Sequence, residues 1–463
     1  MTATLHDTLH LGERRAIDGR RELGRFELPT EHLLTHGVIV GMTGSGKTGL
    51  VTVLVEEALR AEVPVLVVDI KGDLPNLALA FPSFEPEVMA PWVEAAAHDD
   101  DGLADPPEVA RAIEERRAGL AKSGIGEAEL ASFGARSLVR VITPGSSAGE
   151  GLHLLSSLER RSTRWDGDVE GARSAMSAAV SLVLELVGRE SDPARSKEHA
   201  LLSLLAERRL ARGLDAPLDA LIPEVLEPGI EAIGALPLDE FVPPKLRREL
   251  ASDLNTLLAT PTFVAWRAGQ SIDVAAWMAP SEGRTPVTIV SVAHLDDHER
   301  MLVLGVILDE VLGWVRTLPG SSRLKALVVF DEVYGYLPPH PQSPPTKRPL
   351  VSLMKQARAY GVGCVLATQN PMDLDYRALS NAGTWCLGRL STDADRERVL
   401  DGLGEDAKKS VLARTLTKLQ PRWFVVRDAK GAATSLLYPR HAISYLRGPM
   451  TQAEIKRVRA GAR

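Results

Sequence analysis

The sequence HGVIVGMTGSGKTGLV, residues 36–51, contains the pattern G-x-x-x-x-G-K-[ST] from Gly41 to Thr48. The pattern follows a short apolar run and precedes a segment with apolar residues at helical spacing, so it predicts a loop between a strand and a helix. Such a loop points consecutive backbone N–H groups at the phosphates of a nucleotide. We therefore expect the chain to bind ATP together with Mg²⁺.

Individual positions of this loop, the Walker A pattern, have expected roles. Glycine has no Cβ, so the backbone can approach the phosphates closely. Lys47 is expected to span the β- and γ-phosphates, and the hydroxyl of Thr48 to ligate Mg²⁺. A chance match is the alternative, which the strand before the loop and the helix after it disfavour. The expected nucleotide-binding residues are Gly41, Met42, Thr43, Gly44, Ser45, Gly46, Lys47, Thr48 and Gly49.

A second apolar run ends in a pair of acidic residues. In KALVVFDEVYGYL, residues 325–337, four apolar residues precede Asp331 and Glu332. This arrangement is typical of a Walker B strand, in which Asp331 would hold Mg²⁺ and Glu332 would orient and deprotonate the attacking water. The alternative is a buried strand that ends in a solvated acidic pair.

Two more strands end in polar residues. VGCVLATQN, residues 362–370, is expected to lie between the two Walker strands, where Gln369 would sense the γ-phosphate. The alternative for Gln369 is a turn amide before a proline. VVDIKGDL ends the second strand close to the loop, and its polar residues either support the site or cap a turn. These residues are Asp69, Lys71 and Asp73.

The order of the elements predicts an α/β fold with a mostly parallel central sheet, interrupted by an all-helical insertion. Short apolar strands separated by amphipathic helices favour a sheet covered on both faces. Alanine- and leucine-rich segments with helical spacing then occupy the middle of the chain. The expected divisions are an irregular polar arm (1–36), the first part of the core (37–150), the helical insertion (151–284), the second part of the core (285–447) and a tail (448–463).

Composition limits the classes of function. The 463 residues carry a net charge of −7, so no global basic field indicates nucleic acid, although a ring can keep its positive charge inside a pore. Cys364 and Cys386 lie in apolar strand-like runs, which predicts buried thiols in a reducing compartment. Without an apolar leader or a run of about twenty apolar residues, we expect a cytoplasmic protein with no membrane partner.

Three stretches together resemble the HerA/FtsK superfamily of P-loop ATPases, and more closely its bacterial HerA-like members. They are GMTGSGKT with VVDIKGDL, then VVFDEVYGYLPP, then LMKQARAYGVGCVLATQNPMDLDYRALSNAGTWCLGRLSTDADRERVL. The likeness covers residues 37–80 and 285–447, less than half of the chain, and residues 326–400 are its most specific part.

The resemblance implies a RecA-like core that assembles into a homo-hexamer, with ATP bound between neighbouring subunits. Such sites use an arginine from the adjacent subunit to stabilise charge on the transferred phosphoryl group. By position the candidates are Arg389, just past a strand, and Arg358, before the sensor strand. Each has an alternative interpretation as a surface or helix-capping arginine.

Departures from the family pattern affect the expected partners. Only 36 residues precede the loop domain, too few for the N-terminal barrel of HerA, and no winged-helix tail follows. A nuclease or another effector protein is therefore expected as a separate partner.

Two basic segments have open interpretations. The proline-rich residues 338–349 either enter a pore or form a rigid connection, and RRSTRWDGD (160–168) either stacks on a base or is solvated.

Three functions remain open at this point. The first is an ATP-driven translocase or helicase acting on double-stranded DNA, with a partner nuclease or a repair or defence factor. The second is an ATPase acting on polypeptide, of the secretion or remodelling type. The third is a nucleotide-switched assembly scaffold. The superfamily and the ring geometry favour DNA, and the acidic balance of the chain argues mildly against it.

Overall fold

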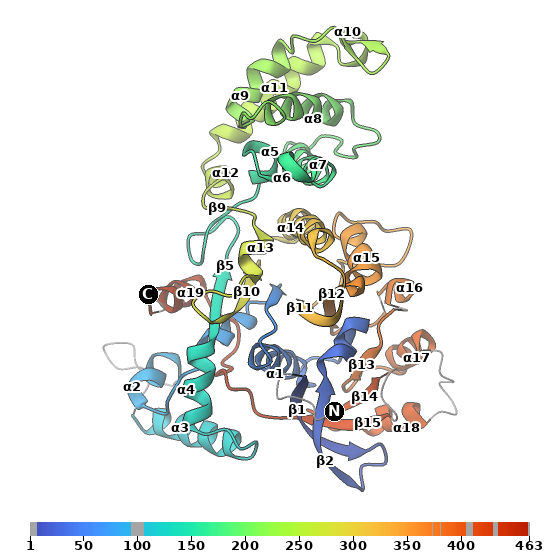
Figure 1. Cartoon of the computed structure of the whole chain (residues 1–463). Coiled ribbons are helices and arrows are strands. Elements are labelled where there is room, and N and C mark those ends of the chain that lie inside the picture. The colour runs from blue at the N-terminus through green and yellow to red at the C-terminus, as the bar shows by residue number, and fades with distance from the viewer. Residues whose placement is uncertain are drawn as a thin grey trace. The chain divides into compact units, whose positions relative to one another are not determined.

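The computed structural model describes residues 7–93, 106–372, 374–379, 381–403, 411–428 and 434–461. The chain forms two compact units (Figure 1). The first unit contains Met1–Val141, Ala275–His294 and Leu318–Arg463, and the second contains Ile142–Val274 and Leu295–Thr317.

One large mixed sheet organises the first unit. Within the described residues it has eleven strands in the order β2-β1-β15-β14-β13-β3-β12-β11-β4-β10-β5. Neighbouring strands from β13 to β10 are parallel, and those from β13 to β2 are antiparallel. The predicted α/β fold with a mostly parallel central sheet is confirmed. The strands are β1 (Thr8–Ala16), β2 (Glu22–Pro29), β3 (Gly37–Val40), β4 (Val65–Asp69), β5 (Ser137–Ile142), β10 (Thr285–Ser291), β11 (Ser321–Asp331), β12 (Tyr360–Thr368), β13 (Thr384–Leu387), β14 (Phe424–Asp428) and β15 (Ser435–Pro439).

The central strands are apolar because both faces of the sheet are covered. Every residue of β3, β4 and β10 is buried, as expected for parallel strands between helical layers. Helix α1 packs against β4, β10 and β11, and it also reaches β1 and β15. The helices along this part of the chain are η1 (Thr30–Thr35), α1 (Lys47–Arg60), η2 (Leu74–Leu79), α2 (Pro86–Met89), η3 (Ala90–Trp92), α3 (Pro106–Ala121), α4 (Glu127–Arg136), α13 (Val274–Met278), α15 (Lys347–Gln356), η4 (Ala357–Ala359), α16 (Tyr376–Leu379), α17 (Asp393–Gly402), α18 (Val411–Lys418) and α19 (Gln452–Gly461).

The N-terminal segment is not the irregular arm that its polar sequence predicted. Strands β1 and β2 form a hairpin, and β1 pairs antiparallel with β15, with Gly12 opposite Pro439 (Figure 1). Leu9 and Leu11 alternate with polar residues, which is the pattern of a strand with one solvated face. That alternation lowers the mean hydropathy of the segment, so composition alone does not predict the strand.

The second unit is mostly helical. Helix α7 packs against α5, α8 and α14, and α9 packs against α8 and α11. The helices are α5 (Ser156–Glu159), α6 (Arg164–Gly167), α7 (Val169–Leu186), α8 (Lys197–Leu210), α9 (Leu218–Leu226), α10 (Leu238–Phe241), α11 (Pro244–Ala259), α12 (Pro261–Trp266) and α14 (Asp297–Thr317). In the described parts of the chain, no helix is long and apolar enough to cross a bilayer.

Two details of the second unit differ from the prediction. It is not all-helical, because four short strands form two pairs, β6 (Leu152–His153) with β9 (Gln270–Ser271) and β7 (Ala232–Ile233) with β8 (Leu236–Pro237). Helix α14, expected in the second part of the core, belongs to this unit because its apolar side packs on α7.

A buried ion-pair cluster fixes the segment after β15 to α1. The Arg440 guanidinium contacts Glu56 Oε2 and Glu57 Oε1, each at 2.8 Å, and none of the three side chains is more than slightly exposed. Glu56 also accepts the backbone N–H groups of Ile443 and Ser444. A buried charge is tolerated when it is paired and hydrogen-bonded, so this cluster holds the chain after β15 in one place.

His36, immediately before β3, is a buried acceptor. Its Nδ1 accepts the backbone N–H of Cys364 at 3.0 Å, which ties β3 to β12, and the residue is 1% exposed. Burial disfavours the protonated ring and lowers the pKa of His36 to about 4. The predicted burial of the two cysteines is confirmed as well.

We expect the first unit to lose stability as the pH falls from about 6.5 towards 4. In that interval the unfolded chain protonates His36 and the folded chain does not, so acid favours unfolding. The loss is about 3 kcal/mol, because one pKa unit corresponds to about 1.4 kcal/mol. The measurement is urea denaturation at several pH values. His36→Asn should flatten this dependence, whereas the neighbouring Thr35→Ala should leave its slope unchanged, and equal slopes in all three proteins would contradict the assignment.

Candidate nucleotide-binding site

The loop between β3 and α1 is anchored to the two strands beside β3. The Gly41 N–H donates to the carbonyl of Thr368 at the end of β12, at 3.1 Å. The Met42 N–H donates to the carbonyl of Arg389, just past β13, at 2.9 Å. The loop therefore begins at a fixed point on the carboxyl edge of the parallel sheet, where ligands bind in open α/β folds.

Three glycines of this loop are required by its geometry. Gly44 and Gly46 have φ values of 75° and 92°, in the left-handed region that favours glycine. A Cβ on Gly41 would lie 2.5 Å from Ser45 Oγ, and one on Gly46 would lie 3.2 Å from the Cα of Arg422. The backbone thus adopts the concave form that the sequence pattern predicted.

Lys47, the first residue of α1, lies among acidic side chains. Its Nζ contacts Asp331 Oδ1 at 2.5 Å and Glu332 Oε2 at 3.6 Å. Lys47 is 3% exposed and Asp331 is 1% exposed. The predicted Walker A lysine and the predicted Walker B pair, 284 residues apart in the chain, are therefore direct neighbours.

Strand register brings the acidic groups together. Asp331 pairs across the sheet with Asp69, which pairs in turn with Ser291. Asp69 accepts hydrogen bonds from Ser291 Oγ and the Gly72 N–H at 2.8 and 3.0 Å. Complete burial, helped by the charge of Asp331, raises the pKa of Asp69 to about 7. Asp69 thus caps the turn at Gly72 and also lies beside Asp331 in the sheet, so both expected roles stay open.

Both carboxylate oxygens of Glu332 are held. Oε1 accepts the backbone N–H of Gln369 at 3.0 Å, and Oε2 lies 2.8 Å from Lys71 Nζ. Burial alone would raise the pKa of Glu332, but Lys47 and Lys71 outweigh it and hold the pKa below its ordinary value. Glu332 has a φ of 66°, uncommon for a non-glycine residue and frequent at functional sites. The carboxylate is therefore ionised and fixed in direction.

Gln369 lies where the strand order predicted. Strand β12 pairs with β3 on one side and β11 on the other, so it separates the two Walker strands. The Gln369 Oε1 accepts the hydroxyl of Thr43 in the loop at 2.8 Å. This contact places Gln369 beside the phosphate loop, and its role as a γ-phosphate sensor stays a prediction.

The two candidate arginines lie at opposite edges of the sheet. Arg389 is exposed and follows β13 at the carboxyl edge, beside the loop. Arg358 is exposed in η4, ahead of β12, so it lies at the amino edge with His36. Only Arg389 is therefore near the phosphate loop of its own chain, and a role for either in a neighbouring subunit stays a prediction.

Arg422 is a neighbour of the loop that the sequence did not reveal. Its backbone N–H donates to the Ser45 carbonyl at 2.9 Å, and its side chain covers Gly46. Its guanidinium lies over the Tyr438 ring, 5.0 Å from the centroid. Arg422 has a φ of 66° just before β14. No motif marks it, because its place depends on how β14 folds back along the sheet.

The residues at this edge suit the Mg²⁺ that accompanies a bound nucleotide. Asp331 Oδ2 is buried and has no hydrogen-bond partner among the described residues. Because buried carboxylate oxygens nearly always have a partner, this oxygen suits a bound ligand such as a metal ion. Thr48 is half-buried in the first turn of α1. Asp331 and Thr48 would hold the ion together with phosphate oxygens and water. Among the described residues, no group of three or more His, Cys, Asp or Glu side chains could hold a metal ion by itself.

Comparison with known proteins agrees with this geometry. Residues 28–91 match the family model described as "Helicase HerA, central domain". The match covers the loop, α1 and β4, so this part of the chain is similar to that central domain. The predicted resemblance to the HerA/FtsK superfamily is confirmed. Among proteins with curated annotation, none matches the chain significantly.

Solved structures extend the likeness to nearly the whole chain. VirB4 of Thermoanaerobacter pseudethanolicus has a TM-score of 0.54 at 12% identity, covering 94% of this chain and 96% of its own. The bacterial conjugative coupling protein TrwB, unbound, has a TM-score of 0.52 at 13% identity, covering 95% and 91%. TrwB has also been solved with ADP and Mg²⁺, at 14% identity and a TM-score of 0.51, covering 92% and 89%. At these identities the likeness establishes the fold.

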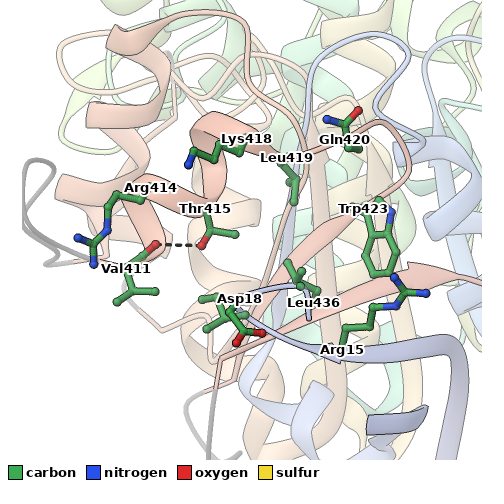
Figure 2. A pocket seen from close by; sticks show the side chains of 12 residues that line it. Arg15, Asp18, Val411, Arg414, Thr415, Lys418, Leu419, Gln420, Trp423 and Leu436 are labelled. Carbon is green, nitrogen blue, oxygen red and sulfur yellow. Dashed lines mark hydrogen bonds between the residues drawn. The ribbon is translucent and has the colours of Figure 1, made fainter. Parts of the chain in front are cut away.

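A hollow of the first unit, here named the α18 groove, is separate from the loop. It has a volume of about 460 Å³ and is lined by Arg15, Arg414, Lys418 and Trp423 among others (Figure 2). The guanidinium of Arg15 lies over the Trp423 ring, 4.9 Å from the centroid. Arg414 and Lys418 are exposed and have no ion pair within the described residues. The groove is thus locally basic in an acidic chain.

Two basic segments noted in the sequence are engaged in the structure. Trp165 is buried, and Arg161 and Arg164 pair with Asp166 and Glu310, so this segment has no aromatic ring free to stack on a base. In the proline-rich segment, Lys347 begins α15, donates to the carbonyl of Gln342 at 3.0 Å and lies 3.4 Å from Asp375. These contacts favour the rigid connection.

Gly46→Ala should weaken nucleotide binding at least tenfold while the protein stays folded. The added Cβ combines an unfavourable φ with close contact to the Arg422 backbone, so the loop must shift. The measurement is calorimetric titration with ADP in the presence of Mg²⁺. Gly167→Ala, where the Cβ meets nothing within 4 Å, is the control and should bind as the parent does. Equal affinity in both variants would contradict the loop assignment.

Proposed function

We propose that this protein is an ATP-hydrolysing motor of the HerA/FtsK type. The observation that carries the proposal is the convergence of Lys47, Asp331, Glu332 and Gln369 at one sheet edge, within contacts of 2.5 to 3.6 Å. These are the parts that phosphoryl transfer to water requires, namely a cation for the phosphates, a metal ligand, a base and a sensor.

In this proposal each side chain has one task in hydrolysis. The loop N–H groups and Lys47 bind the β- and γ-phosphates, and Mg²⁺ neutralises their charge when bound. The Glu332 carboxylate accepts a proton from water, whose oxygen attacks the γ-phosphorus as the bond to the bridging oxygen breaks. ADP and inorganic phosphate are the products. The ionised state of Glu332 supports this role.

Substitution separates binding from hydrolysis. Lys47→Ala should abolish turnover and weaken ATP binding, because it removes the cation from the phosphates. Glu332→Gln should retain ATP binding and lower kcat by about 10² to 10⁴, because an amide cannot take the proton of water. Turnover and equilibrium binding are measured on both. If Glu332→Gln hydrolysed ATP at the parental rate, Glu332 would not be the general base.

The proposal extends to a ring of identical subunits, as the superfamily resemblance implies. Arg389 is the arginine we assign to the neighbouring subunit's ATP, since it is exposed at the carboxyl edge. A homo-hexamer and a cytoplasmic location remain predictions of the sequence, as does a partner nuclease or other effector protein.

Double-stranded DNA is the substrate we propose. The α18 groove supports it with local positive charge, which is the feature that binds the phosphates of the duplex. The alternative is a polypeptide substrate or a nucleotide-switched scaffold, which the net charge of −7 favours. Response of the ATPase to DNA distinguishes these functions.

Long double-stranded DNA should raise the ATPase rate several-fold at low salt, and less at moderate salt, because phosphate contacts release counterions. Arg414→Ala combined with Lys418→Ala should lower the ratio of stimulated to DNA-free rate. Lys245→Ala with Arg248→Ala removes the same charge from exposed positions of α11 and is the control. If the variant with Arg414→Ala and Lys418→Ala is still stimulated like the parent, the α18 groove is not the DNA-binding surface, but a DNA substrate is still possible. Robust hydrolysis indifferent to DNA would exclude a DNA motor.

A further inference from the structure

Lys71 lies at the phosphate-binding edge of the sheet, and the function proposed above gives it no role. It belongs to the loop that follows β4. Its Nζ lies 2.8 Å from Glu332 Oε2, and Lys47 Nζ lies 3.6 Å from the same oxygen. Two ammonium groups therefore approach one carboxylate oxygen of the residue that we assign as the base for hydrolysis.

The two lysines differ in how much they are exposed. The Lys47 side chain is 3% exposed, whereas that of Lys71 is 36% exposed. A lysine ammonium sits on a flexible four-carbon stem, and its three donors can turn to a new partner. Lys71 therefore approaches Glu332 from the solvent side, where its ammonium can change partner without repacking the interior.

The backbone beside Lys71 is held from two sides, so the side chain is the part that can move. Gly72 has a φ of 86°, and its N–H donates to Asp69 Oδ1 at 3.0 Å. Its carbonyl accepts the N–H of Met450 at 2.9 Å. A Cβ on Gly72 would lie 3.3 Å from the Cβ of Ala293. The stem of Lys71 thus starts from a fixed point, and its ammonium stays within reach of the site.

Binding of ATP would change what these ammonium groups face. In the structure Lys47 contacts Asp331 at 2.5 Å as well as Glu332. In the proposed function Lys47 turns to the phosphates, and Glu332 contacts the water that attacks the γ-phosphorus. The γ-phosphate and the carboxylate of Glu332 then lie close together, and like charges at short range repel unless a cation is near both. Lys71 already lies against that carboxylate.

We propose that Lys71 is a second phosphate-binding cation, which contacts Glu332 before ATP binds and the γ-phosphate afterwards. The inference rests on the proposed function. In this exchange Glu332 Oε2 loses its ion pair with Lys71 and becomes available to the attacking water. Oε1 keeps the backbone N–H of Gln369, so the carboxylate does not lose its direction.

The exchange gives the site a means of distinguishing ATP from ADP. ADP has no γ-phosphate, so in the ADP complex Lys71 stays on Glu332 and adds nothing to the affinity. Hydrogen bonds between an ammonium and a phosphate are stronger than those between neutral groups. The contribution of Lys71 is therefore measurable as a difference between the two nucleotides.

Calorimetric titration with ADP and with the non-hydrolysable ATP analogue ADPNP, both with Mg²⁺ present, tests this contact. Lys71→Ala should weaken ADPNP binding by about tenfold or more and change ADP binding by less than about twofold. Lys71→Arg keeps a cation and should recover most of the ADPNP affinity. The control is Lys355→Ala, at an exposed position of α15, which should bind both ligands as the parent does. Equal losses for ADP and ADPNP in Lys71→Ala would overturn the inference.

A second background separates contact with the γ-phosphate from simple neutralisation of Glu332. Glu332→Gln has no charge to neutralise, so adding Lys71→Ala to it measures the direct contact alone. We expect the double variant to bind ADPNP about tenfold or more weakly than Glu332→Gln does. Equal ADPNP affinity of these two proteins would show that Lys71 acts only on Glu332 and would overturn the inference. A parent protein that binds neither ADP nor ADPNP would overturn the proposed function itself.

Discussion

Negative charge at the carboxyl edge of the parallel sheet is the constraint around which this structure is arranged. Asp69, Asp331 and Glu332 meet there in largely buried positions, where unpaired carboxylates would cost several kcal/mol each. The ammonium of Lys47 offsets part of that charge, and the pKa of Asp69 rises so that its carboxyl is partly neutral at pH 7. Helix α1 must therefore begin at this edge, which fixes the loop that precedes it.

The sequence predicted the parts of this site that local patterns specify. Loop glycines, an acidic pair after four apolar residues and a polar residue after a third strand each mark a strand end, and parallel strands place their ends at one edge. The β1–β2 hairpin was missed because Leu9 and Leu11 alternate with polar residues. Composition alone does not distinguish such an edge strand from a loop.

Other parts of the site depend on distant pairings that no local pattern encodes. Arg422 touches Gly46 because β14 runs antiparallel to β13, and Ser444 lies against α1 because Arg440 and Glu56 bind the segment after β15 to that helix. The placement of α14 in the second unit has the same origin. Its sequence is apolar enough for either unit, and packing on α7 decides between them.

The pairing of β1 with β15 has a consequence for biosynthesis. Strand β1 can pair with β2 at once, but its other edge finds β15 only after Ser435–Pro439 has been translated, and Lys47 likewise waits for Asp331. Until then a nascent chain leaving the ribosome exposes the hydrogen-bonding edge of β1 and an unneutralised lysine. Contacts so distant in sequence slow folding and leave strand edges open to other chains.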